Sequence, residues 1–378
     1  MKTFLQTTLI CLCALSLAGC FESGNDSGLS SYSDTAQIQL SANTAPLPVN
    51  NSSAAFYSDI RYGSDPLQTF DLFLPQAASP GQTFPLVIYI HGGSFNSGDK
   101  NVVYSDVNDE GEPSYGQFER SQKYSEQINA YLSNDVAFAT INYRLLEQES
   151  IDRDGVKKSL NDMQRTLQFI RFHAATLNID KQRIGLHGLS AGAGGALWIG
   201  LRNEQADSSS QDPIAQESSR VQAIAAQETQ STYDLVDWIS TGALSSYFPL
   251  SELFYRQIID LIFVVQPNLK TQILSFFAMQ DVTKLYSTAA TSYRESVDFI
   301  NEISSDDPEL WVSNVEENNA FPTNQTLFFH HPLHAKELLD KVTKENANGV
   351  FYIPKLNVSD ESNETLTAFM FRKLGVNE

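Results

Sequence analysis

The stretch RIGLHGLSAGAGG, residues 183–195, decides how this chain is expected to fold. It begins as a short apolar strand, makes a tight glycine turn with Ser190 at its tip, and continues as the first turn of a helix. Its core, GLSAG, fits the pattern G-x-S-x-G, which gains its meaning from a strand before it and a helix after it. Ser190 is therefore the predicted nucleophile.

The two glycines around Ser190 have a physical role. A serine on a strained strand-to-helix turn brings neighbouring backbones close together, so a side chain at either glycine is expected to clash. The same turn leaves the amide of Ala191 at a helix N-terminus, where it can donate to an oxyanion. Ala191 is therefore expected to form part of an oxyanion hole.

A second glycine-rich loop supplies the other half of that hole. His91-Gly92-Gly93 follows the apolar run PLVIYI, and flexible glycines let backbone amides turn toward a developing negative charge. Gly92 and Gly93 are the predicted donors. His91 is expected to orient the loop and to transfer no proton.

Strand patterns alternate with helical patterns along the chain. PLVIYIHGG and VAFATINYRL are apolar runs typical of strands buried on both faces, and SLNDMQRTLQFIRFHAATLNI has helical spacing of its apolar residues. VQAIAAQ, ELWVSNV and GVFYIP are further expected strands, and DIRYGSDPLQTFDLFLP is typical of a hairpin. The pattern predicts an α/β fold with a doubly wound, mostly parallel sheet.

The segment from about 231 to 300 breaks this rhythm. It is rich in aromatic and aliphatic residues at helical spacing, as in SELFYRQIIDLIFVV and QILSFFAMQDV, and shows no obvious strand. Two interpretations remain open: a helical cap inserted over the sheet, or extra packing helices with no role at the site.

The composition excludes one class of partner. The 378 residues carry 45 Asp and Glu against 25 Lys and Arg, a net charge of −20. Binding to a phosphate backbone needs clustered positive charge, so no nucleic-acid partner is expected. All three cysteines lie in the first twenty residues. The rest of the chain therefore has no thiol for a disulfide, a metal site or a cysteine nucleophile. No metal and no cofactor are expected.

The N-terminus has the pattern of a targeting segment. Lys2 precedes an apolar run that ends in LAGC at residues 17–20. LAGC resembles the lipobox of bacterial lipoproteins, which implies a signal peptide over 1–19 and an acylated Cys20. The alternative is an ordinary secretory signal with a chance cysteine. Residues 20–55 are expected to be a flexible tether, with the globular domain over 56–378.

Phe21 stands where an inner-membrane retention signal has Asp, so the lipobox resemblance implies attachment to the outer membrane of a Gram-negative cell envelope.

Four motifs together resemble one family. HGGSF, INYRL, GLSAG and TFDLFLP look like the α/β-hydrolase superfamily, on its carboxylesterase and hormone-sensitive-lipase-like side, over roughly residues 56–228. The resemblance implies a serine hydrolase that cleaves esters through an acyl-enzyme. Ser94 departs from the pattern because many relatives have a third glycine there.

The expected base is absent from its usual place. In this family a histidine follows the last strand, here GVFYIP, yet the chain has none after it. His330, His331 and His334 occur earlier, next to a helix that Pro332 is expected to begin. We predict His331 as the base because the residue before the helix is free to turn, and His334 is the next choice. His173 and His187 are expected to be structural.

Three glutamates are candidates for the acid that orients the base. The loop after ELWVSNV offers Glu316 and Glu317, which matches the family's usual position, and Glu228 after VQAIAAQ is the alternative. We predict Glu317. Asp306 and Asp307 precede their strand and are expected at the wrong end of the sheet.

Two functions from different classes follow. The first is hydrolysis of a small-molecule or lipid-like ester by a lipid-anchored enzyme. The second is a non-catalytic binding protein that keeps the fold but lacks a working base. The sequence leaves the individual substrate and the oligomeric state open.

Overall fold

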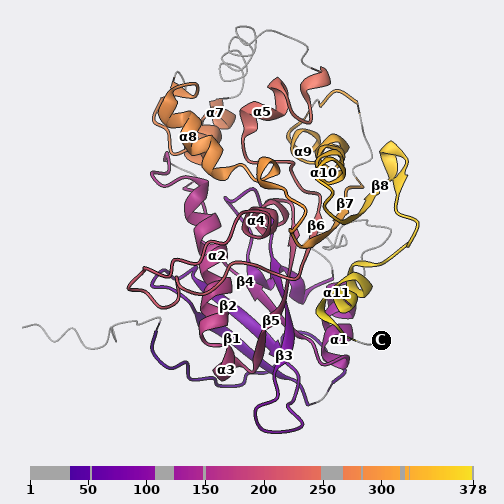
Figure 1. Cartoon of the computed structure of the whole chain (residues 1–378). Coiled ribbons are helices and arrows are strands. Elements are labelled where there is room, and N and C mark those ends of the chain that lie inside the picture. The colour runs from indigo at the N-terminus through magenta and orange to yellow at the C-terminus, as the bar shows by residue number, and fades with distance from the viewer. Residues whose placement is uncertain are drawn as a thin grey trace, which may run out of the picture. The chain divides into compact units, whose positions relative to one another are not determined.

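The computed structural model describes residues 35–51, 53–106, 123–147, 150–247, 267–281, 284–315, 320–322 and 324–376 (Figure 1). These residues fall in one compact unit that runs from Ser33 to Glu378.

A nine-stranded sheet forms the centre of this unit, in the order β1-β2-β4-β3-β5-β6-β7-β8-β9. Its strands are β1 (Ala55–Arg61), β2 (Thr69–Leu74), β3 (Phe84–Ile90), β4 (Ala137–Ile141), β5 (Ile179–Leu189), β6 (Ala223–Gln227), β7 (Glu309–Ser313), β8 (Gly349–Ile353) and β9 (Val358–Ser359).

The six strands from β4 to β8 pair in parallel, and the antiparallel pairs lie at the two edges of the sheet. The predicted hairpin is present as β1 and β2, which pair antiparallel. The predicted α/β fold with a mostly parallel sheet is confirmed.

Helices cover both faces of the sheet. They are α1 (Tyr124–Ser133), α2 (Val156–Phe172), α3 (Ala174–Leu177), α4 (Ala191–Gly200), α5 (Leu235–Ser240), α7 (Pro267–Phe276), α8 (Thr288–Val297), α9 (Gln325–Phe329), α10 (Pro332–Lys344) and α11 (Leu366–Leu374). Short 3₁₀ helices occur at Lys100–Tyr104, Ser245–Tyr247, Ile300–Glu302 and Pro354–Leu356.

Each face of the sheet has its own apolar core, because successive strand residues point to opposite sides. Leu86, Ile88 and Ile90 of β3 pack with α2, α4 and α10, whereas Val87 and Tyr89 pack with α1 and α11. Figure 1 shows α1 and α11 together beside the sheet and α2 and α4 in front of it. All seven residues of β3 are buried, as a continuous apolar run requires.

The described part of the expected tether contacts the globular body. Asn43 bridges to Phe56, Leu47 is buried, and the amide of Asn50 donates to Asn129 Oδ1 of α1 at 2.6 Å. The packed body therefore begins before residue 56. The predicted signal peptide and Cys20 lie outside the described residues.

The described residues between β6 and β7 form helices and no strand. Two hydrogen bonds fix them to the segment that leads into α2. Ser275 Oγ of α7 donates to Ser150 O at 3.2 Å, and Tyr293 OH of α8 donates to Asp154 O at 3.1 Å. The apolar stretch SELFYRQIIDLIFVV lies outside the described residues, and the cap over 231–300 stays a prediction.

We expect Leu186→Ala in β5 to lower the free energy of unfolding by about 2–5 kcal/mol, because it leaves a cavity in a closely packed core. Leu186 is 1% exposed. Denaturant unfolding followed by circular dichroism measures the change. Gln182→Ala, at an exposed position of the same strand, is the control and should change the free energy by less than about 0.5 kcal/mol. Equal effects of the two substitutions would contradict the packing assignment.

Candidate active site

Parallel strands bring the candidate residues to one edge of the sheet. Ser190 follows β5, Gly92 follows β3, Glu228 follows β6 and Asn314 follows β7. These strands are neighbours that run in the same direction, so their carboxyl ends meet at the same edge. The candidate active site is built on loops that a rigid sheet positions.

Ser190 occupies a strained turn between β5 and α4. Its φ is +53°, in the left-handed region that non-glycine residues seldom adopt. A Cβ on Gly188 would lie 2.2 Å from Gly192 O, and a Cβ on Gly192 would lie 2.0 Å from Ile90 O of β3. Backbone packing therefore requires both glycines of the GLSAG turn, as expected from the sequence.

His91 holds the loop that follows β3. Its Nδ1 donates to Gly92 O at 2.7 Å, and its ring stacks on Tyr143 with centroids 4.4 Å apart. The carbonyl and the amide of a trans peptide point in opposite directions. The amide of Gly93 therefore points away from the His91 ring. A Cβ on Gly92 would lie 3.2 Å from Ser190 Cβ, so the loop packs directly on the serine turn.

The same loop contains three successive residues with positive φ. Gly93, Ser94 and Phe95 have φ values of +105°, +54° and +63°. Gly93 O accepts hydrogen bonds from the amides of Asn96 and Ser97 at 3.0 and 3.1 Å, which closes the turn. Ser94, where the resemblance leads one to expect a third glycine, thus keeps a left-handed backbone despite its side chain.

The histidine beside Ser190 is His330. Its Nε2 lies 2.7 Å from Ser190 Oγ, and His330 is the residue at which the short helix α9 ends. The prediction placed His331 at this position. The structure corrects it by one residue.

His331 is occupied elsewhere because it is the N-cap of α10. Its Nδ1 accepts a hydrogen bond from Leu333 N at 3.2 Å, and its Nε2 donates to Ala320 O at 3.0 Å. Pro332 takes the first helical position, as predicted. An N-cap side chain turns back to the amides of its own helix. His331, the residue before Pro332, is therefore not free to turn toward Ser190. This rule was the sequence signal that could have identified His330.

The other histidines are structural in their contacts. His334 Nε2 donates to Phe328 O at 3.1 Å, and its Nδ1 lies 3.1 Å from Ser231 Oγ. His187 is fully buried in β5 with Nε2 2.8 Å from Gln227 Oε1. His173 is buried where α2 ends.

Burial lowers the pKa of the His330 imidazole to about 4. Removing the ring from water disfavours its charged form. His330 is therefore neutral at neutral pH and can accept a proton from Ser190. Burial also lowers the pKa of His334, to about 3.

The structure gives no position for the predicted acid relative to Ser190 and His330. Glu317 and Glu316 lie outside the described residues. Glu228 is buried with a φ of +50°, and its Oε1 accepts a hydrogen bond from Val315 N at 2.7 Å. Within the part of the chain that the structure describes, no carboxylate is hydrogen-bonded to the His330 ring.

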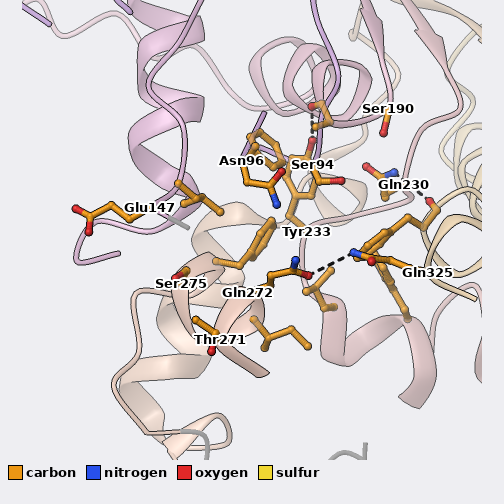
Figure 2. A pocket seen from close by; sticks show the side chains of 18 residues that line it. Ser94, Asn96, Glu147, Ser190, Gln230, Tyr233, Thr271, Gln272, Ser275 and Gln325 are labelled. Carbon is orange, nitrogen blue, oxygen red and sulfur yellow. Dashed lines mark hydrogen bonds between the residues drawn. The ribbon is translucent and has the colours of Figure 1, made fainter. Parts of the chain in front are cut away.

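A pocket of about 510 Å³ opens beside Ser190. Figure 2 shows Ser190, Ser94 and Gln230 at one end of it, with Thr271 and Gln272 of α7 across from them. Its aromatic walls are Phe95, Tyr233, Trp238, Phe276 and Phe329.

Four amide side chains and one carboxylate add polar groups to these walls. The amides are Asn96, Gln230, Gln272 and Gln325, and the carboxylate is the exposed Glu147. The sequence analysis missed all five. No motif marks them, because they come from loops and helices that only the folded chain brings together.

Tyr233 fixes one wall to the serine turn. Its hydroxyl donates to Ala191 O at 2.6 Å, a bond drawn in Figure 2. A Cβ on Gly194 would lie 2.2 Å from the same hydroxyl. The ring of Tyr233 therefore packs tightly on the first turn of α4. Among the described residues, no group of three or more His, Cys, Asp or Glu is placed to hold a metal ion.

The BD-FAE family model matches residues 114–252, a part of the chain that contains β4, β5, Ser190 and β6. No curated protein matches the sequence significantly.

Solved structures of similar fold include esterases. A truncated carbohydrate esterase from gut microbiota has 14% identity and a TM-score of 0.53, covering 87% of this chain and 99% of its own. Esterase 2 of Thermogutta terrifontis has 12% identity and a TM-score of 0.49, covering 86% and 92%. An inhibited esterase B from Lactobacillus rhamnosis has 16% identity and a TM-score of 0.48, covering 87% and 88%. The likeness to the truncated carbohydrate esterase, together with the mostly parallel sheet described above, shows that the chain has the α/β-hydrolase fold.

Proposed function

We propose that this protein is a serine hydrolase that cleaves carboxylic esters through an acyl-enzyme intermediate. One observation carries the proposal: Ser190 Oγ lies 2.7 Å from His330 Nε2 at the tip of the strained turn. A nucleophile within hydrogen-bond reach of a neutral base is the arrangement that activates a serine hydroxyl. The BD-FAE match and the esterases of similar fold agree with this reaction class.

The reaction proceeds in two halves. Ser190 Oγ attacks the carbonyl carbon of the ester while His330 Nε2 takes the hydroxyl proton. The tetrahedral intermediate then breaks its bond to the alcohol oxygen, which receives that proton from His330. In the second half a water molecule gives a proton to His330, attacks the acyl carbon and releases the acid, and the proton returns to Ser190.

The oxyanion is proposed to bind the amides of Gly92, Gly93 and Ala191. Ala191 begins α4, so its amide is free of intrahelical bonds and lies at the positive end of the helix dipole. Each donor aimed at an oxyanion stabilises the transition state by about 3 kcal/mol.

The pocket favours a neutral ester. Aromatic walls such as Tyr233 and Trp238 bury apolar groups of the acyl or alcohol part, and the amide of Gln272 binds polar ones. The carboxylate of Glu147 disfavours a substrate that carries a negative charge of its own. The orienting acid stays a prediction at Glu317, with Glu316 and Glu228 as alternatives.

The competing interpretation was a binding protein without a working base. Its main support was the lack of a histidine after the last parallel strand. The contact between Ser190 and His330 weakens that support, because it offers a candidate base from another loop. The glycines that the strained turn requires also favour an enzyme.

We expect Ser190→Ala and His330→Ala to lower kcat/KM for short p-nitrophenyl esters by about 10³-fold or more, because each removes a member of the reacting pair. His331→Ala is the matched control, since it removes the neighbouring imidazole, which caps α10. This control should retain most of the activity, and initial-rate kinetics on folded protein give the comparison.

A fluorophosphonate probe should label the wild-type protein and leave Ser190→Ala unlabelled, because the probe reacts with an activated serine. Turnover by Ser190→Ala at the wild-type rate would exclude the proposed mechanism. Loss of activity in His331→Ala but not in His330→Ala would transfer the role of base back to His331.

The pH dependence of kcat/KM should show an acid limb with a midpoint of about 4. The proton-accepting form of His330 is the neutral ring, and burial lowers its pKa to about 4. Activity is therefore retained above this pH and is lost as the pH falls through it. Circular dichroism of Ser190→Ala over the same range separates titration from unfolding. A midpoint near the ordinary histidine value of about 6.5 would contradict control of this pKa by burial alone and would indicate that a carboxylate, such as the predicted Glu317, offsets the burial.

We further propose that Cys20 is acylated and anchors the enzyme to a membrane of the cell envelope, the outer membrane in a Gram-negative cell. The support is the lipobox-like sequence LAGC. Among the residues that the structure describes, no helix is both long and apolar enough to cross a bilayer.

Cys20→Ser should abolish incorporation of radiolabelled palmitate and block cleavage before residue 20, because the thiol is the acylated group. Labelling and membrane fractionation of cells that express each form make the test. Equal incorporation in the parent and in Cys20→Ser would exclude the anchor, and Ser190→Ala serves as a variant that should be labelled normally.

A further inference from the structure

The candidate base, His330, belongs to an element that is too short to be stable without contacts to the rest of the fold. His330 ends α9, a helix of five residues between β7 and β8. A helix this short has little stability of its own. The carbonyls of its last residues also have no partner within the helix. Something outside α9 must therefore hold the backbone of His330.

Three side chains supply those partners. His334 Nε2 donates to Phe328 O at 3.1 Å, Gln230 Nε2 donates to Phe329 O at 3.0 Å, and Asn314 Nδ2 donates to His330 O at 2.9 Å. Three consecutive carbonyls at the end of α9 are thus each bound by a different side chain. Figure 2 shows the bond from Gln230 beside Ser190.

The donors are themselves fixed to the rest of the fold. Gln230 follows β6 and is 5% exposed. Asn314 follows β7, is fully buried, and donates its backbone amide to Tyr352 O of β8 at 2.9 Å. His334 belongs to α10, where its Nδ1 lies 3.1 Å from Ser231 Oγ. The end of α9 is therefore tied to β6, β7 and α10.

The side chain of Asn314 gives a second, independent indication that these hydrogen bonds serve to hold the end of α9. Its Oδ1 is buried with no hydrogen-bond partner among the described residues. A buried oxygen without a partner is costly, and an apolar side chain of similar size would avoid the cost. The benefit that Asn314 brings to the fold therefore lies in its Nδ2, which holds the carbonyl of the base.

We propose that Asn314 and Gln230 are positioning residues that hold the backbone of His330 so that its ring stays within hydrogen-bond reach of Ser190. This inference rests on the proposed function. Neither residue touches the reacting atoms. Their loss would displace the base, and a displacement of about 1 Å can lower a rate by about 100-fold.

Asn314→Leu and Gln230→Met test the proposal, because both replace an amide by an apolar side chain of similar size. We expect kcat for p-nitrophenyl esters and the rate of fluorophosphonate labelling to fall by about 10- to 100-fold. KM should change little for Asn314→Leu. Its melting temperature should change little, because the substitution removes the unpaired Oδ1 and also leaves His330 O without its donor, and these two effects oppose each other.

Asn134→Leu is the matched control. Asn134 Nδ2 donates to Ala130 O at 2.9 Å near the end of α1. It makes the same kind of bond on the other face of the sheet. We expect this control to lose stability and to keep the wild-type kcat.

The outcomes separate the two proposals. If the wild type neither turns over esters nor reacts with the probe, the proposed function fails and this inference fails with it. If the wild type is active and folded Asn314→Leu and Gln230→Met keep its kcat, only the positioning role is excluded. A kcat that falls in parallel with melting temperature, or loss of folding in both variants, would show that the two amides are structural and would also overturn it.

Discussion

The site depends on one constraint, the direct packing of backbone against backbone where α4 begins. A Cβ on Gly192 would lie 2.0 Å from Ile90 O, and one on Gly188 would lie 2.2 Å from Gly192 O. The helix therefore starts in contact with the ends of both β3 and β5. This contact forces Ser190 into a left-handed backbone and brings the loop after β3 against it. The same packing positions Ser190, the proposed nucleophile, and the loop at Gly92 and Gly93 that is proposed to bind the oxyanion.

Most of the fold could be predicted from the sequence, because strands buried on both faces are continuous apolar runs. PLVIYI and VQAIAAQ form β3 and β6 as expected, and alternation with helices gave the parallel sheet. The serine turn could also be predicted from the sequence, because its glycines are required by steric contacts close by in the chain. Such signals need no knowledge of distant parts of the chain.

The candidate base and the pocket depend on contacts between distant parts of the chain, and the sequence alone did not predict these contacts. Ser190 and His330 are 140 residues apart, and no local pattern states which histidine of the pair at 330 and 331 faces the serine. A capping argument decides it, since Pro332 makes His331 the N-cap of α10. Gln230 and Asn314 carry no motif at all, and their contacts with α9 exist only in the folded chain.

The proposed base, His330, lies on a different loop from the one that the family resemblance implies, and this position needs other support from the fold. A histidine that follows the last parallel strand is positioned by that strand, whereas His330 follows a five-residue helix that the sheet does not support directly. Side-chain donors must then provide the support that a strand would give. At the end of α9, each of three consecutive carbonyls accepts a hydrogen bond from a different side chain. Burial lowers the pKa of His330 and so keeps its ring neutral at neutral pH. If His330 is the base, its position is therefore compatible with an α/β-hydrolase fold because buried amides bind the backbone of the loop that carries it.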